Sequence, residues 1–184
     1  MPKIEINRVW AMPNSATFSI KPIESFITKI VSEYRVKKML TGGARIIDPF
    51  CNGRVDIADV NNDLDPDKEA DCHMDSLDFL KTFGDRSVDG VLFDPPYSPR
   101  QVSEVYRSMG KTVNMQTTQA SFWSNMKNEV GRIVKPNGFC FVCGWNSGGI
   151  GKKYGFSIAE ILIVPHGGWH NDTIVTLEYK NENL

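Results

Sequence analysis

The chain has 184 residues, of which 41% are hydrophobic and 23% are charged. This length and composition predict one globular domain over residues 1–184 with a sizeable core. No stretch is apolar enough to span a bilayer, and the first ten residues lack signal-peptide order, so we expect a cytoplasmic protein without a membrane partner. The 21 Lys and Arg residues against 22 Asp and Glu residues exclude a global positive field, so any polyanion contact must be local.

Short apolar runs alternate with helical patterns, which predicts an α/β fold around a mainly parallel sheet. Helices are predicted from Ile23 to Leu40, ending at two glycines, and from Thr117 to Val134. A turn over 135–138 precedes a strand, and the tight connection 165–171 suits a closing hairpin. The predicted strands are the apolar runs at residues 45–50, 55–60, 72–74, 87–93, 139–143, 158–164 and 173–179.

Acidic residues stand where successive predicted strands end. Asp48, Asp63 and Asp75 occur in this order, and Asp94 ends a further strand. In open α/β sheets, ligands bind beyond the carboxyl ends of the strands. Four carboxylates in this arrangement predict a cleft for a ligand rich in hydroxyl and amino donors. For each carboxylate taken alone, a helix cap or a solvated turn is an equally good interpretation.

The most specific motif is Asp94-Pro95-Pro96-Tyr97, directly after an apolar strand whose ladder the prolines cannot continue. Together with Asp48-Pro49-Phe50-Cys51-Asn52-Gly53 and the earlier Lys-Pro segment 18–23, it resembles the amino-methyltransferases that modify adenine N6 or cytosine N4 in DNA. The resemblance is to small, phage-type members without a separate target recognition domain. It implies a Rossmann-like methyltransferase fold, with a mainly parallel seven-stranded sheet and a C-terminal antiparallel hairpin, and S-adenosylmethionine as cofactor.

The resemblance also implies where the methionine end of the cofactor binds. It places this end near Asp48, Phe50 and Gly53, with Lys21 and Pro22 closing one side. The glycine-containing motif is not the dinucleotide fingerprint G-x-G-x-x-G, so taken alone it is a weak signal.

The adenosine end of the cofactor is expected at the next two acidic segments. The ribose hydroxyls suit a bidentate carboxylate, for which Asp63 is the best match and Asp65 the alternative. Asp75, beside Ser76, would accept a hydrogen bond from the amino group of the cofactor's adenine.

The tetrapeptide suits methylation of an aromatic amine. The lone pair of adenine's amino nitrogen is delocalised, so this nitrogen is a poor nucleophile until two acceptors hold its hydrogens. The carboxylate of Asp94 and the carbonyl of Pro95, freed from the ladder by Pro96, would each accept one hydrogen. Tyr97 would stack on the base, which must be flipped out of a duplex or lie in a single strand. A plain turn is the alternative interpretation of these residues.

Substrate contacts are expected from basic residues outside these motifs. The stretch Ser98–Met115 shows no core periodicity and is predicted as a polar loop that grips phosphate or the flipped strand. A solvated surface is an equally good interpretation. The expected nucleic-acid contacts are Arg100, Arg107 and Lys111, with Lys152 and Lys153 as a second patch.

Other motifs are assigned structural roles. Cys140 and Cys143 form C-x-x-C in a predicted buried strand, where residues three apart point to opposite faces. His166 and His170 are assigned to the hairpin turn rather than to a metal, and no metal site is predicted. Two tryptophans are assigned to the core rather than to base stacking, Trp123 and Trp145.

Several functions remain open at this level. The same residues suit methylation of an amino group in RNA, of cytosine N4 or of a protein amide. Family members that act on glutamine use Asn in the first motif position, and cytosine enzymes more often use Ser, so Asp94 favours adenine. A catalytically silent cofactor-binding subunit is a further alternative. Because the length leaves no room for a recognition domain, we expect minimal target selection, a recognition partner or a homo-oligomer.

Overall fold

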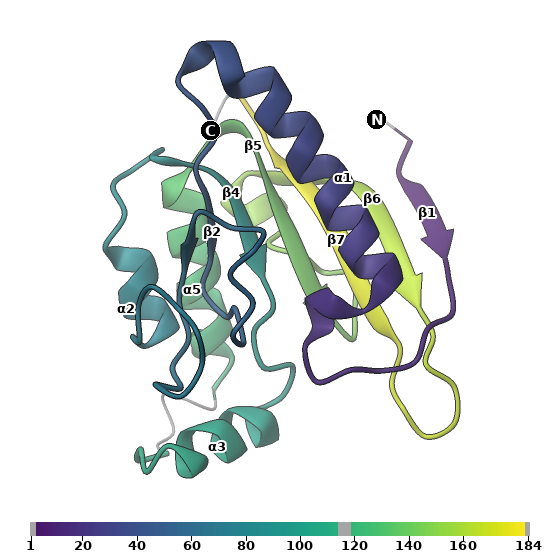
Figure 1. The fold of residues 1–184 in the computed structure, drawn as a ribbon, viewed down its shortest axis with the longest axis vertical. Coiled ribbons are helices and arrows are strands. Elements are labelled where there is room, and N and C mark those ends of the chain that lie inside the picture. Colours follow the sequence, from purple (N-terminus) through teal and green to yellow (C-terminus); the bar gives the residue numbers. More distant parts are fainter. Residues whose placement is uncertain (1–2, 114–118, 183–184) are drawn as a thin grey trace.

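One layer of β-sheet lies between helices on its two faces (Figure 1). The computed structural model describes residues 3–113 and 119–182. Within them, seven strands form one sheet in the order β1-β6-β7-β5-β4-β2-β3. Neighbouring strands are parallel except at β7, which is antiparallel to β5 and β6. This confirms the predicted, mainly parallel seven-stranded sheet with its C-terminal hairpin.

The elements have the following bounds. The strands are β1 Glu5–Arg8, β2 Ile46–Asp48, β3 Val60–Asn61, β4 Val88–Phe93, β5 Val134–Gly144, β6 Phe156–Val164 and β7 Thr173–Lys180. The α-helices are α1 Lys21–Lys38, α2 Ser76–Lys81, α3 Pro99–Ser108 and α5 Ala120–Ile133. Short 3-10 helices occupy Thr17–Ser19, Met39–Thr41 and Lys152–Tyr154. None of the described helices is long and apolar enough to cross a membrane.

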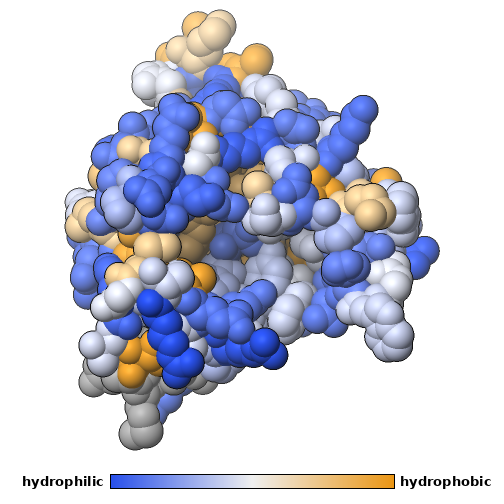
Figure 2. Space-filling model, turned by 60° about the horizontal axis from the view of Figure 1, so that its bottom comes forward, coloured by the Kyte–Doolittle hydropathy of each residue, from blue (hydrophilic) through white to orange (hydrophobic). Residues whose placement is uncertain are grey.

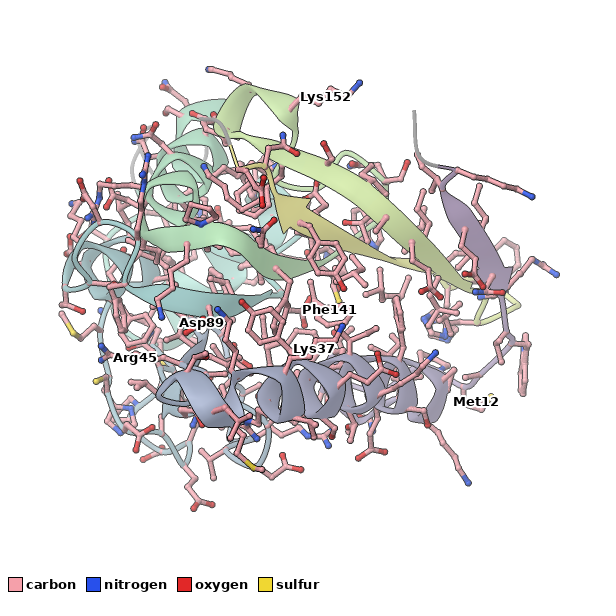
Figure 3. All side chains as sticks on the ribbon, turned by 90° about the horizontal axis from the view of Figure 1, so that it is seen from above. Met12, Lys37, Arg45, Asp89, Phe141 and Lys152 are labelled. Atoms are coloured by element: carbon pink, nitrogen blue, oxygen red, sulfur yellow. The ribbon has the colours of Figure 1, made fainter. Side chains whose placement is uncertain are left out.

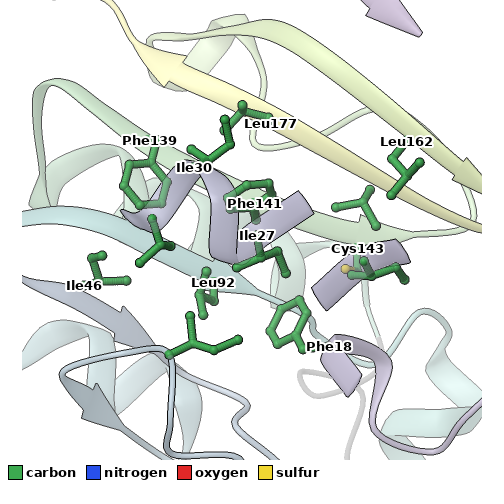
Figure 4. Packing of buried hydrophobic residues seen from close by; sticks show 14 of the residues in the cluster. Phe18, Ile27, Ile30, Ile46, Leu92, Phe139, Phe141, Cys143, Leu162 and Leu177 are labelled. Atoms are coloured by element: carbon green, nitrogen blue, oxygen red, sulfur yellow. The ribbon is translucent and has the colours of Figure 1, made fainter. Parts of the chain in front are cut away.

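Helix α1 covers one face of the sheet (Figure 3). Its buried residues Ile23, Ile27 and Ile30 recur at helical spacing and enter a cluster with Leu92 and Phe141 of the sheet (Figure 4). The helix begins two residues before the predicted start, because a proline fits the first turn. It ends where predicted, in a 3-10 turn followed by a left-handed glycine.

Helices α2 and α5 cover the opposite face. Phe79 of α2 and Met126 and Val130 of α5 are buried in a second cluster against β4 and β5. Strand β5 contributes to both clusters, since Cys140 belongs to the second and Cys143 to the first. This confirms that the two thiols point to opposite faces, and both are free and buried.

Parts of the chain differ from the predicted elements. The run 55–60 is a strand only from Val60 onwards; at Asp59 the backbone amide donates to the Ile46 carbonyl, while the amide of Ile46 donates to the Asp59 carboxylate rather than to a backbone carbonyl. The predicted strand at 72–74 is an isolated bridge between Asn62 and Cys72. Residues 135–138 bulge within β5 rather than separate two elements. Strand β1 and helix α2 are not predicted by the sequence pattern.

Candidate active site

The carboxyl ends of β2 and β4 lie side by side. The two strands are parallel neighbours, with Ile47 opposite Val91, whereas β3 pairs with the other edge of β2. The strand order therefore reverses between β2 and β4, the place where open α/β sheets bind ligands. Asp48 ends β2 and Asp94 directly follows β4, so both acidic residues reach this point.

A first pocket of about 380 Å³ opens beside these strand ends. Figure 2, in which this end of the molecule is turned forward, shows a hollow with apolar residues inside and hydrophilic residues around it. The volume lies in the range of small-molecule sites. Of the predicted cofactor residues, those that line the pocket are Phe50, Asp63, Asp75 and Ser76, together with the alternative Asp65.

The other predicted cofactor residues lie outside the pocket wall. Asp48 is buried behind it and accepts a hydrogen bond from the amide of Phe50 at 2.8 Å, which fixes the turn after β2. Burial raises the pKa of Asp48 well above its ordinary value. Lys21, Pro22 and Gly53 are not among the lining residues. The N-terminal segment reaches the pocket instead through two residues that the sequence does not single out, Ser15 and Thr17.

The loop after β3 is organised by Asp63. One carboxylate oxygen accepts the amide hydrogen of Asn52 at 2.8 Å, and the other accepts that of Asp65 at 2.8 Å. These bonds tie the loops after β2 and β3 together and direct both acidic side chains to the same wall. Each carboxylate oxygen of Asp63 retains a second lone pair for a ligand hydroxyl.

Asp75 connects two helices at the pocket rim. It caps α2 by accepting the amide hydrogen of Leu77 at 3.0 Å, and its other oxygen accepts the hydroxyl hydrogen of Tyr106 on α3. Burial, with the hydrogen bond to Asp75, raises the pKa of Tyr106. The Asp75 carboxylate thus already holds α3 in place. The expected contact with an amino group of the cofactor would use a further lone pair of the same carboxylate.

Asp94 lies at the junction of the loops and lines the first pocket. Its Oδ1 atom accepts the hydroxyl hydrogen of Tyr97 at 2.5 Å, and Thr17 lies 3.5 Å from the same hydroxyl. Burial raises the pKa of Asp94 to about 6, although the bonds to Tyr97 and Thr17 lower it. The backbone of Tyr97 is fixed by its amide, which donates to Gln101 at 2.6 Å. The carboxylate is thus preorganised and remains ionised above pH 6.

A second pocket of about 370 Å³ lies on the other side of the same tetrapeptide. Pro95, Pro96 and Tyr97 line both pockets, so this segment is the wall that they share. The indole of Trp123 donates to the Pro96 carbonyl at 2.9 Å. Within the described residues, the Pro95 carbonyl has no hydrogen-bond partner, which leaves it available to a bound molecule.

The tryptophan assignments are partly corrected. Trp123 is partly buried and packs on the second core cluster, as predicted, although it also lines the second pocket. The core assignment of Trp145 is wrong, because this side chain is 43% exposed and lines the same pocket. Its ring meets the ring of Tyr97 edge to face at 5.7 Å. The signal for Trp145 was its place directly after β5, where the sheet's carboxyl edge continues.

The prediction of a polar loop from Ser98 to Met115 is wrong over residues 99–108, which form α3. Ser98 accepts the amide hydrogen of Gln101 and caps the helix, and Val102 is fully buried. Residues 114 and 115 lie outside the described part of the chain. The expected basic contacts of this stretch therefore lie on, or just after, an amphipathic helix at the pocket mouth.

The basic residues fall into two separate places. Arg100 is exposed and pairs with Glu104 at 2.7 Å, while Arg107 and Lys111 are exposed at the other end of α3. Lys152 and Lys153 precede the first residue of β6, at the amino edge of the sheet, away from Asp94 (Figures 1 and 3). The structure does not bring the two groups together.

The two histidines assigned to the hairpin turn, His166 and His170, lie in the connection between β6 and β7. The two ring nitrogens of His166 lie 2.8 Å from the Ala11 carbonyl and 2.8 Å from the Thr173 hydroxyl, so this side chain ties the N-terminal segment to the hairpin. His170 is exposed. Within residues 3–113 and 119–182, no three His, Cys, Asp or Glu side chains are grouped for a metal ion.

Comparisons with known proteins find likeness in structure. No protein-family model matches the sequence, and no curated protein does. TrmN from Thermus thermophilus superposes with a TM-score of 0.53 at 13% identity, over 88% of this chain and 49% of TrmN, so the chain spans about half of that protein. The 1,6-didemethyltoxoflavin-N1-methyltransferase of Burkholderia thailandensis, solved with bound S-adenosylhomocysteine, gives a TM-score of 0.49 at 11% identity, over 84% of this chain and 78% of that enzyme.

At these identities, the likeness concerns the fold alone. The Rossmann-like methyltransferase fold that the motifs imply is confirmed by the sheet topology and by the match to TrmN.

The raised pKa of Asp94 predicts that an uncharged replacement stabilises the protein at high pH. Because the folded-state pKa is about 6 against an ordinary 3.8, the favourable contribution is complete below 3.8 and is lost as pH rises through 6. We expect Asp94→Asn, which can still accept from Tyr97, to unfold at higher denaturant concentration than the unmodified protein at pH 8. The advantage should vanish near pH 4. The exposed Asp78→Asn serves as control. Equal stability of Asp94→Asn and the unmodified protein at pH 8 would show that the pKa of Asp94 is not raised.

Proposed function

We propose that this chain is an S-adenosylmethionine-dependent methyltransferase that methylates N6 of adenine in DNA. The observation that carries the proposal is that two pockets share Pro95, Pro96 and Tyr97 as a common wall, beside the partly buried carboxylate of Asp94, which lines the first pocket. Methyl transfer needs a donor and an acceptor that meet at one point while each is held separately. Two pockets that touch only at a segment bearing hydrogen-bond acceptors meet this requirement.

The first pocket suits the cofactor. Asp63 and Asp65 present carboxylate oxygens for the ribose hydroxyls, and Phe50 and Ser76 line the same wall. A carboxylate is the usual acceptor for ribose hydroxyls at this position of an α/β sheet. When bound, S-adenosylmethionine supplies an electrophilic methyl group on a positively charged sulfur.

The second pocket suits the amine. A base lying between Trp145 and the tetrapeptide would direct its amino hydrogens to the Pro95 carbonyl of the shared wall and, at the edge of the first pocket, to the Asp94 carboxylate. These acceptors draw the nitrogen lone pair out of conjugation. Asp94 would accept the amino proton that the nitrogen loses on methylation, since its carboxylate is ionised above pH 6. Because the unliganded Tyr97 hydroxyl already donates to Asp94, it competes with the substrate amine for this oxygen.

DNA is proposed as the substrate because of the motif and because α3, which carries Arg100 and Arg107, begins at the second pocket with Pro99. An adenine inside a duplex cannot reach a recessed pocket, so the base would be flipped or already unpaired. Asp94 in the first motif position favours adenine over cytosine by resemblance. RNA, cytosine N4 and a protein amide are outcomes of the same assay, and a cofactor-binding subunit without activity is a further outcome.

Replacing Asp94 tests the proposed chemistry directly. The purified chain is incubated with labelled S-adenosylmethionine and unmethylated DNA, RNA or protein extract, and labelled DNA is digested to nucleosides. We expect label in N6-methyladenine, and a decrease of about 100- to 1,000-fold in the rate with Asp94→Ala, the effect of removing one preorganised polar group.

Asp78→Ala, on the exposed face of α2, is the matched control and should keep the full rate. A folded Asp94→Ala variant with unchanged turnover would refute the mechanism. Label that enters only RNA or only protein would show that DNA is not the substrate and would identify RNA or protein in its place.

The basic residues on α3 and just after it are expected to contact phosphate. We expect the triple variant Arg100→Ala, Arg107→Ala and Lys111→Ala to bind DNA with a salt dependence shallower by roughly two to three units of log–log slope, since each phosphate contact contributes about 0.7 to 0.9. Affinity is measured across salt concentrations. Lys29→Ala with Lys37→Ala, two exposed residues of α1, is the control. An unchanged slope in the triple variant would show that this helix does not contact phosphate.

A further inference from the structure

The second pocket holds one charged side chain among its described lining residues, Lys127 of α5. Lys127 follows Trp123 by four residues, so the two side chains share one face of the helix. Trp123 bonds to Pro96 of the shared wall. Since α5 runs from the carboxyl edge of the sheet towards the amino edge, Lys127 lies one turn deeper than that contact (Figure 1).

The ammonium group of Lys127 is held by the loop after β5. It donates to the carbonyl of Gly149, and it lies in the field of the buried Glu178 of β7. Glu178 in turn accepts the amide hydrogens of Ile150 at 2.5 Å and Gly151 at 3.1 Å. Gly149 has a φ of 57°, and a Cβ there would overlap the Glu178 carboxylate, so the loop requires glycine at this position. In this conformation of the loop after β5, the Gly149 carbonyl points at the ammonium group of Lys127.

This arrangement leaves the cation incompletely satisfied. An ammonium group has three hydrogens to donate, and within the described residues Gly149 is its one hydrogen-bond partner. The rest of the pocket wall presents aromatic rings, prolines, aliphatic carbons, the thiol of Cys143 and a single amide side chain, that of Asn146. Placing a charge in such surroundings costs free energy unless further hydrogen bonds form. A bound molecule with an acceptor atom would provide them.

We propose that Lys127 is a specificity-determining residue that donates a hydrogen bond to a ring acceptor of the substrate base. The inference rests on the proposed function, because it takes the second pocket as the site of the amine. The pocket then selects heteroaromatic amines that carry an acceptor in the ring system beside the amino group. In adenine, the two ring nitrogens that flank the amino group are N1 and N7.

Binding of deaza analogues tests this contact. Adenosine, 1-deazaadenosine and 7-deazaadenosine are titrated into the protein saturated with S-adenosylhomocysteine, and the fluorescence of the pocket tryptophans is followed. We expect Lys127→Met to weaken adenosine binding roughly ten- to hundredfold, as for loss of a charge-assisted hydrogen bond. For the analogue that lacks the bonded nitrogen, the unmodified protein and Lys127→Met should bind within about threefold of each other.

Controls separate this contact from folding and from catalysis. Lys37→Met, on the exposed surface of α1, should bind all three nucleosides like the unmodified protein. Lys127→Arg keeps the charge and should retain part of the adenosine affinity if the variant Lys127→Met fails to fold. Equal losses on adenosine and both analogues, no loss on adenosine, or no adenosine binding by the unmodified protein would each overturn the proposal. Intact, Lys127-dependent binding without methyl transfer to any base would instead refute the proposed function alone.

Discussion

A partly buried carboxylate, Asp94, at the end of the buried strand β4 is the constraint on which the site depends. Two prolines stop the ladder of β4 immediately after Asp94, so neither this side chain nor the Pro95 carbonyl is used to hold the sheet together. Burial raises the pKa of Asp94 to about 6, which shows that the folded protein accepts an unfavourable charge there. The bond from Tyr97 offsets part of that cost and fixes the direction of the carboxylate. Strained or costly groups of this kind are concentrated where a protein binds or reacts.

Much of the fold follows from local pattern. The buried strands β4 to β7 are runs of branched and aromatic residues, and α1 has an unbroken apolar stripe, so these elements are predicted within a few residues. Helix α3 was predictable too, since Ser98 before Pro99 is a capping signal and Val102 and Tyr106 lie four residues apart. The strand predicted at 55–60 is shorter than its apolar run, and next to it a side chain enters the pairing, since the amide of Ile46 donates to the Asp59 carboxylate.

The candidate site also has a part that the sequence predicts and a part that it does not. The order of strand-end carboxylates predicts the wall made by Asp63 and Asp75, because parallel strands deliver their carboxyl ends to one edge. The roles of Tyr106 and Trp145 depend on contacts between elements distant in sequence, one with Asp75 and one with Tyr97. The spacing of residues in the sequence does not predict such pairs, because tertiary packing of the helices against the sheet determines which side chains meet. The second pocket could therefore not be predicted from the sequence pattern.

The proposed function requires the cofactor and the amine to occupy separate pockets that meet at residues 95–97. The most direct measurement is a crystal structure of the protein with S-adenosylhomocysteine. We expect the ribose at Asp63 or Asp65, the adenine near Asp75, and the sulfur against the wall shared with the second pocket. S-adenosylhomocysteine bound elsewhere, or bound with its sulfur directed away from Asp94, would contradict the proposed function.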